Sequence, residues 1–338
     1  MHCSGTISVL ICTYRRPNDL LRCLSALEQQ TLPPAEVIVT VRDNDAETFA
    51  ALSSRDNSRL PLRILVIFKA GVIAARNAAL DVCKSDFMVM ADDDTAAHPD
   101  WLERIYALFA ANPSVGGIGG RDRCLLNGEW DDRQQARVGE IQWFGRLIGN
   151  NHLGFGAPRT AHILKGANMS FRMSAVGDLR VDERLRGSGA QPHEDSVFCA
   201  SLRKKGYDIL YDPSILVDHY EGQRDEPRHY SDVLRVKVAE ELRDLGFNWA
   251  IVMSIEFPFW RQAIFIAWNF LIGTRIAPGL VQAVRFTPSL GVHAWWRFWL
   301  IQQGTFRCYA YLFRTRKQQP ERNSSETRLC QAEDSTQH

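Results

Sequence analysis

Residues 87–94 read Phe87-Met88-Val89-Met90-Ala91-Asp92-Asp93-Asp94, an apolar run that ends abruptly in acids. The apolar part predicts a buried strand, and the aspartates mark its carboxyl end. Further apolar runs at residues 7–11, 37–41 and 62–68 alternate with segments of helical periodicity. This alternation predicts an α/β fold, a mostly parallel sheet with helices on both faces. Because ligands bind beyond the carboxyl ends of such strands, we expect the chemistry near the aspartates.

Asp92 and Asp94 are the first candidate metal ligands. In an extended chain, positions i and i+2 point the same way, so these two carboxylates share a face. Hard oxygen ligands of this kind suit Mg²⁺ or Mn²⁺ that also contacts phosphates. A solvated acidic turn is the alternative, but a strand before the motif and a helix after it favour the metal. His219, in Val217-Asp218-His219, is a candidate third ligand, although a lone histidine is more often structural.

Two other acidic positions accompany this motif. Asp43 follows the second apolar run, where a carboxylate can accept the imide N–H of uracil. On these residues alone, a simple turn at Arg42-Asp43-Asn44-Asp45 is the better supported alternative. Glu194 and Asp195 open a predicted helix, where they either complement the helix dipole or include a general base for an acceptor hydroxyl.

The segment Lys165-Gly166-Ala167-Asn168-Met169-Ser170 is a candidate for binding the acceptor or the sugar. Glycine permits a close approach between backbone and ligand, and an asparagine amide can recognise hydroxyls. The alternative is a tight loop that precedes a strand.

In their order along the chain, these motifs resemble family 2 glycosyltransferases with the GT-A fold, over about residues 7–224. Residues 11–17 resemble the family's first strand and donor loop, residues 75–77 its Arg-Asn pair, and residues 166–172 its acceptor-side strand. The opening also resembles bacterial exopolysaccharide glycosyltransferases of the succinoglycan type. Arg42 departs from the family, which often has an acid at this position, and this departure concerns recognition of the donor base.

The resemblance implies a role for each candidate residue. Asp195 is the expected catalytic base, and Mg²⁺ or Mn²⁺ is expected on Asp94, Asp92 and His219. The nucleotide-sugar donor is expected to contact Thr13, Tyr14, Arg16, Asp43, Arg76, Asp92 and Asp93. The acceptor or the transferred sugar is expected to contact Gly166, Asn168 and Glu194.

The implied reaction is an inverting transfer of a sugar from a nucleotide-sugar, with UDP as the expected carrier. The expected acceptor is a hydroxyl of a glycan or of a polyprenyl-linked oligosaccharide in cell-surface polysaccharide synthesis. One alternative is a nucleotide-sugar pyrophosphorylase, which would need a glycine-rich loop after the first strand, whereas residues 12–17 contain no glycine. Another is a non-catalytic sugar-binding protein, which would not need Asp92, Asp94 and Asp195 together.

The pattern along the chain predicts three parts. A catalytic domain is expected over residues 1–229, with a nucleotide-sugar half at about residues 1–120 and an acceptor half at about residues 121–229. Within the acceptor half, residues 121–160 are expected to form loops and short strands. Residues 230–313 predict a helical, amphipathic region, and residues 314–338 a polar, disordered tail.

The predicted helical region has an unusual charge distribution. No Asp or Glu occurs between Glu256 and Glu321, whereas eight Arg or Lys residues and five Trp residues do. Basic residues interleaved with aromatic ones predict an element that lies on an anionic membrane surface. The longest uncharged run, residues 262–274, is shorter than the ~20 residues that a spanning helix needs.

Composition limits the remaining possibilities. The net charge is +1, which disfavours nucleic acid as a partner of the whole molecule. None of the eight cysteines forms a C-x-x-C pair, so we expect reduced thiols. Arg15 and Arg16 come too early for the apolar core of a signal peptide. The expected location is therefore the cytoplasm, peripheral on the inner face of the cell membrane.

Overall fold

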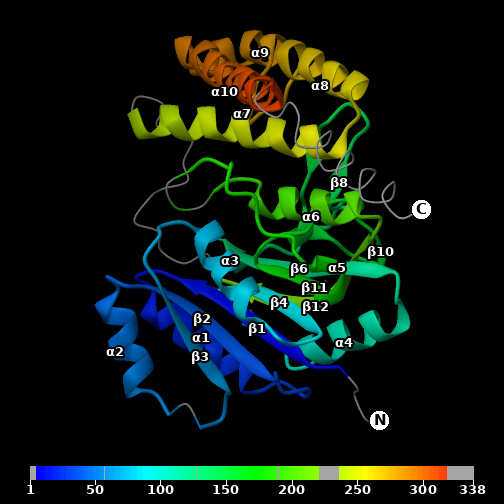
Figure 1. Cartoon of the computed structure of the whole chain (residues 1–338). Coiled ribbons are helices and arrows are strands. Elements are labelled where there is room, and N and C mark those ends of the chain that lie inside the picture. Colours follow the sequence, from blue (N-terminus) through cyan, green and yellow to red (C-terminus); the bar gives the residue numbers. More distant parts are fainter. Residues whose placement is uncertain are drawn as a thin grey trace, which may run out of the picture.

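The computed structural model describes residues 5–317 except residues 57, 127, 188, 190 and 221–235. Its centre is a mixed sheet (Figure 1). One half of the sheet is parallel, in the order β3-β2-β1-β4, as the apolar runs predict. These strands are β1 (Ile7–Thr13), β2 (Glu36–Arg42), β3 (Leu62–Ile67) and β4 (Phe87–Asp92). The helices that connect and follow them are α1 (Pro17–Leu27), α2 (Ala46–Ser54), α3 (Val72–Val82) and α4 (Trp101–Ala111).

The other half of the sheet contains the antiparallel pairings. β11 (Asn168–Arg172) lies between β4 and β6 (Val115–Leu126) and is antiparallel to both. β12 (Asp208–His219) runs parallel to β6, so the carboxyl ends of β1, β4, β6 and β12 lie at the same edge of the sheet. Short elements complete this half: β5 (Thr95–Ala97), β7 (Glu129–Trp130), β8 (Glu140–Ile141), β9 (Leu147–Ile148), η1 (Asn151–Leu153), β10 (Arg159–Thr160), α5 (Met173–Val176) and α6 (Glu194–Lys204).

The expectation of loops and short strands over residues 121–160 is correct for most of that segment and wrong at its start. β6 continues through Leu126 because it pairs with β12 along its length. A sequence rich in glycine, with an alternation of arginine, aspartate and cysteine, conceals this strand. The consequence for the site is that Asp122 and Cys124 are strand residues that share a face.

Two hydrophobic cores lie on the two faces of the sheet, and β4 shows how they are built. Its alternate side chains enter opposite cores, as the twofold period of a strand requires. Phe87 and Val89 pack in the core with α1 and α4. Met88 and Met90 pack in the core with α3 and α6. The strand is therefore fixed from both sides, which also fixes the aspartates at its end.

The C-terminal region is helical, as predicted, and shares a core with the catalytic part. It consists of α7 (Val236–Glu256), α8 (Phe259–Leu271), α9 (Leu280–Leu290) and α10 (Val292–Lys317). Helix α7 lies between α6 and α10, and helices α8, α9 and α10 form the outermost layer, beyond α7 from the sheet (Figure 1). Asn248 of α7 donates hydrogen bonds to the carbonyls of Arg186 and Pro192, at 2.8 Å each. The helical region is therefore anchored to the catalytic part by buried polar contacts as well as by apolar packing.

The two predicted boundaries of the C-terminal parts have different outcomes in the structure. The boundary between residues 229 and 230 lies outside the described residues. Helix α10 continues through Lys317, so residues 314–317 are helical and do not belong to the predicted disordered tail. Residues 318–338 of that tail lie outside the described residues. Among the described helices, none combines the length and the apolar character needed to cross a bilayer.

Candidate active site

Three of the predicted metal ligands lie together at the carboxyl edge of the sheet. Asp92 ends β4, Asp94 follows it, and His219 ends β12. One oxygen of each carboxylate and one ring nitrogen of His219 lie within 4.8 Å of one another. Residues 127 positions apart thus form one cluster because β5, which follows Asp94 directly, pairs with the end of β12 and places Thr95 opposite His219.

This cluster fits a divalent cation. His219 is 3% exposed, and its Nε2 atom lies 3.2 Å from Asp94 Oδ1. A buried nitrogen aimed at a carboxylate oxygen, with a second carboxylate beside them, is a donor set that Mn²⁺ or Mg²⁺ accepts. Burial opposes the charged imidazole, but hydrogen bonds to Asp122 and Asp94 raise the pKa of His219 well above its usual value.

Arg16 neutralises the acidic cluster from the donor loop. Its Nη1 donates to Asp94 Oδ2 at 2.8 Å, and its Nη2 lies 2.8 Å from Asp93 Oδ1. Asp93 is completely buried, and burial raises the pKa of its carboxyl to about 8 despite the opposing effect of Arg16. The structure therefore gives Asp93 the role of holding Arg16, and its side chain does not line the open edge where a donor was expected to touch it.

The donor loop after β1 is held in place by a residue that sequence reasoning missed. Arg15 has a positive φ of 55°, and its backbone N–H donates to Asp45 Oδ2 at 2.6 Å. The same carboxylate accepts from the Thr48 hydroxyl and caps α2. An aspartate three residues before a threonine at a helix start is a capping pattern that could have revealed this role. Next to this bend, Thr13 is buried and Tyr14 is exposed.

Asp43 lies at the carboxyl end of β2, on the same edge of the sheet as the aspartates of β4. It follows β2 directly, and its side chain is 40% exposed. Its nearest charged neighbour is Arg42, whose Nη2 lies 3.4 Å from Asp43 Oδ1. The carboxylate remains accessible to a ligand at the end of the strand, next to the loop that carries Tyr14.

Arg76, Glu194 and Gly166 form a buried unit behind the aspartates. Arg76 pairs with Glu194, and its Nη2 lies 3.7 Å from Asp92 Oδ1. Burial raises the pKa of Glu194 to about 7, although Arg76 acts in the opposite direction. A Cβ atom at Gly166 would lie 2.5 Å from Arg76 Nη2, so the close approach that this glycine allows is to Arg76. The predicted contacts of Glu194 and Gly166 with an acceptor therefore give way to a supporting role for both residues.

Asp195 is the acid of the pair that stays accessible. It lies in the first turn of α6, is partly exposed, and accepts a hydrogen bond from the Ser196 backbone N–H at 2.6 Å. The preceding residue, His193, has a positive φ of 68°, which turns the chain sharply into the helix. Glu194 thus points inward to Arg76 while Asp195 does not.

Asn168 was expected to recognise hydroxyls, and its position does not support this. Its side chain accepts from Trp101 Nε1 at 2.9 Å and donates to the carbonyls of Arg121 and Ile215. It is buried, with its amide groups occupied by these partners. Asn168 therefore joins β11 to β6 and β12, and its side-chain amide is engaged by protein partners.

The chain matches the model of the family described as "Glycosyl transferase family 2" over residues 8–180, about half of its length. It is 24% identical over 232 residues to a glucosyl-dolichyl phosphate glucuronosyltransferase of Haloferax volcanii, which covers 63% of this chain and 68% of the relative. It is 38% identical over 103 residues to the succinoglycan biosynthesis protein ExoM of Rhizobium meliloti, which covers 29% of this chain and 33% of the relative.

Solved structures agree on the fold. A mannosyltransferase, PcManGT of Pyrobaculum calidifontis, solved with GDP-Man and Mn²⁺, has a TM-score of 0.50 and 16% identity, and covers 91% of this chain and 86% of its own. GalNAc-T7, solved with UDP, GalNAc and Mn²⁺, has a TM-score of 0.53 and 13% identity, and covers 72% of this chain and 48% of its own. The family match, together with the acidic edge and the mostly parallel sheet, shows that this chain belongs to glycosyl transferase family 2 and is a transferase with the GT-A fold.

Proposed function

We propose that this chain is an inverting, metal-dependent glycosyltransferase that moves a sugar from a UDP-sugar to a hydroxyl of a lipid-linked glycan. The observation that carries the proposal is the cluster of Asp92, Asp94 and His219 at the carboxyl edge of the sheet. The relative named for succinoglycan biosynthesis supports a role in cell-surface polysaccharide synthesis.

The donor is proposed to lie across this edge, with its base near Asp43 and its diphosphate near the aspartates. A bound Mg²⁺ or Mn²⁺ would neutralise charge on the departing diphosphate. Arg16 and Arg76 add fixed positive charge around the cluster, which favours the negative charge that develops as the sugar leaves. Tyr14, exposed on the donor loop, offers an aromatic face to the nucleotide.

Asp195 is proposed to be the general base. It would take the proton of the acceptor hydroxyl as that oxygen attacks the anomeric carbon. The bond from that carbon to the donor phosphate breaks in the same step, and the nucleoside diphosphate leaves with the electron pair. Among the described residues of the site we find one candidate base, Asp195, and no obvious nucleophile, which supports a single displacement with inversion.

A membrane surface is the proposed location of the acceptor. On α10, the exposed apolar residues recur at helical spacing and form one stripe: Val292, Trp295, Trp299, Phe306 and Phe313. Helices α8 and α9 expose further large apolar side chains, which include Phe259, Trp260, Phe270, Val281 and Val284. Exposed arginines lie among them, at Arg275, Arg285, Arg307 and Arg314. Apolar faces of this extent with arginines beside them suit the headgroup boundary of an anionic bilayer, on its cytoplasmic side.

A donor screen tests the proposed reaction. The protein is incubated with Mn²⁺ and a UDP-, GDP- or dTDP-sugar, and release of the free nucleotide is measured with and without chelator. We expect slow, metal-dependent hydrolysis of a UDP-sugar. Release from another nucleotide-sugar would correct the donor, and undiminished release in excess chelator would contradict the metal role. A pyrophosphorylase would instead release a nucleoside triphosphate from nucleotide-sugar and pyrophosphate.

Flotation with liposomes tests the proposed membrane contact. Full-length protein is expected to float with anionic vesicles at low salt and to remain in solution with neutral vesicles or at high salt. Protein that stays in the soluble fraction with anionic vesicles at low salt would refute the membrane role without affecting the proposed chemistry.

A further inference from the structure

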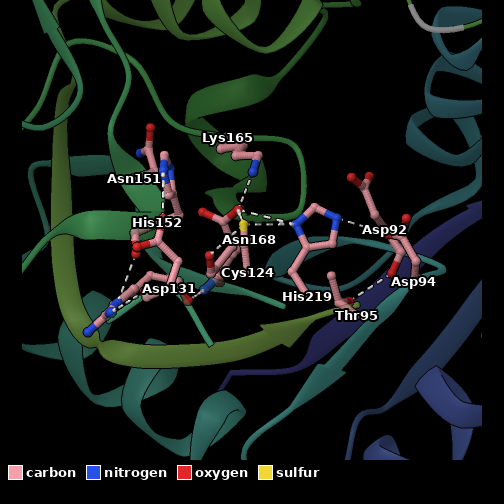
Figure 2. A network of polar contacts seen from close by, with 12 residues as sticks. Asp92, Asp94, Thr95, Cys124, Asp131, Asn151, His152, Lys165, Asn168 and His219 are labelled. Carbon is pink, nitrogen blue, oxygen red and sulfur yellow. Dashed lines mark hydrogen bonds and ion pairs between the residues drawn. The ribbon is translucent and has the colours of Figure 1, made fainter. Parts of the chain in front are cut away.

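The imidazole of His219 is held from two sides. Its Nε2 faces Asp94, whereas its Nδ1 lies 3.3 Å from Asp122 Oδ2. Asp122 is completely buried in the second half of β6 and bonds in turn to the ammonium of Lys165, in the loop before β11. Figure 2 shows this chain of contacts from Lys165 to His219 and on toward Asp94 and Asp92.

We propose that Asp122, supported by Lys165, is a positioning residue that keeps the Nε2 atom of His219 directed at the cation-binding carboxylates. This inference rests on the metal-dependent transfer proposed above. It adds two residues to the site: Asp122, which the sequence did not single out, and Lys165, which the sequence placed only in the candidate acceptor-binding segment. Both are proposed to act through His219 and not by direct contact with the donor or the cation.

The reason lies in the two nitrogens of the ring. A neutral imidazole binds a cation through the nitrogen that carries no proton, so Nε2 is available only if the proton is on Nδ1. A carboxylate that accepts from Nδ1–H fixes this tautomer and the ring orientation together. Asp122 is placed to do so, because β6 and β12 are paired and Cys124, two residues after Asp122, lies opposite His219.

The ammonium of Lys165 balances the negative charge of the buried Asp122 carboxylate. The group Asp122, Cys124 and His219 also has the spacing of a metal site. However, the Lys165 ammonium already bonds to the same carboxylate oxygen that faces His219, so a cation is present at this position. We therefore assign the second cluster to support, and the cation to the cluster that contains Asp92 and Asp94.

Titration of the full chain with Mn²⁺ alone, followed by electron paramagnetic resonance of the free ion, tests the inference. Asp122→Asn is expected to weaken Mn²⁺ binding by roughly 10–100-fold, the usual effect of removing an outer-shell partner. Asp131→Asn is the matched control, because Asp131 is also a buried carboxylate of the network in Figure 2 but pairs with Arg133 and does not contact His219. Its Mn²⁺ affinity is expected to equal that of the wild type.

The double variant Asp122→Asn with Lys165→Met keeps the test valid if the single variant does not fold, since it leaves no unpaired ammonium. Its Mn²⁺ affinity is expected to stay low. Recovery of wild-type affinity would show that Asp122 only neutralises Lys165, and would overturn the inference.

¹⁵N spectra of histidine-labelled protein with Mg²⁺, assigned through His219→Gln, give an independent readout. The His219 proton is expected on Nδ1 in the wild type, and a proton on Nε2 would also overturn the inference. If the wild type itself does not bind Mn²⁺, the proposed metal dependence fails together with this inference, whereas equal binding by wild type and Asp122→Asn contradicts the positioning role alone.

Discussion

The sheet edge buries charged side chains, whereas the outer helical layer exposes apolar ones. At the edge, Asp93, Asp94, Asp122 and His219 are buried, and each is matched by a neighbour of complementary charge or hydrogen-bonding capacity. In the outer layer, Phe259 is 81% exposed, Phe306 75% and Trp299 56%. Both arrangements cost free energy in water, since buried charges lose hydration and exposed aromatic rings order solvent.

We infer that the two regions contact different partners. The edge holds charge in fixed positions, which suits a charged ligand such as a cation and a diphosphate. The outer layer is apolar and basic and contains no acidic residue, which suits a surface that is both apolar and anionic. The same chain thus separates chemistry from location, and variants in the two regions should affect different measurements.

The largest expected effect is on transfer, from Asp195→Asn. Loss of a general base reduces turnover by roughly 10²–10⁴-fold. Donor affinity, measured by calorimetry, should remain near that of the wild type because the role proposed for Asp195 is toward the acceptor. A collapse of donor affinity together with the rate would make Asp195 a binding residue.

Asp94→Asn is expected to reduce transfer by about 10³-fold, through loss of several kcal/mol of cation-mediated stabilisation. Circular dichroism should show a folded protein, since the amide can still accept from Arg16. Excess chelator should reduce the wild type to a similar rate and have little further effect on the variant. Full activity of the wild type in chelator would contradict the assignment of the cluster.

A third variant concerns stability at the buried edge. Arg76→Met leaves Glu194 buried without its partner, which should lower the free energy of unfolding by about 3–5 kcal/mol. Adding Glu194→Met should recover much of this loss, because two apolar side chains then replace the ion pair. Urea denaturation of the single and double variants measures both, and equal stability of all three proteins would show that the pair is not energetically coupled.

The smallest effect is expected from the outer layer. Trp299→Ser and Phe306→Ser should each weaken binding to anionic vesicles by about tenfold, from loss of roughly 1.5 kcal/mol of apolar burial. Hydrolysis of a soluble donor should not change, because these side chains lie on the exposed stripe of α10. Trp101→Phe, in the core beneath the sheet, serves as an aromatic control that should leave vesicle binding intact. A fall in donor hydrolysis in the Trp299→Ser or Phe306→Ser variant would show that the two regions do not act separately.

Local sequence predicted the parallel half of the sheet, its helices, and the acidic strand end. Apolar runs and periodicity suffice there, because each strand and its following helix are adjacent in the chain. The helical nature of the C-terminal region and the lack of acids between Glu256 and Glu321 were also evident from the residues alone. The composition suggested a surface element, and the structure shows that its apolar residues are exposed on α8, α9 and α10.

Sequence alone did not determine which acids face the open edge. Asp92, Asp93 and Asp94 are consecutive, yet Asp93 is buried against Arg16 while Asp92 remains partly exposed. Glu194 and Asp195 are adjacent, yet only Glu194 pairs with Arg76. Nor could a local pattern show that Asp122 and Lys165 support His219, because these contacts join β6, the loop before β11 and β12 across the sheet. Strand periodicity assigns a side chain to a face, but long-range strand pairing decides which charged groups meet there, and so only the tertiary structure assigned these residues to support or to the open site.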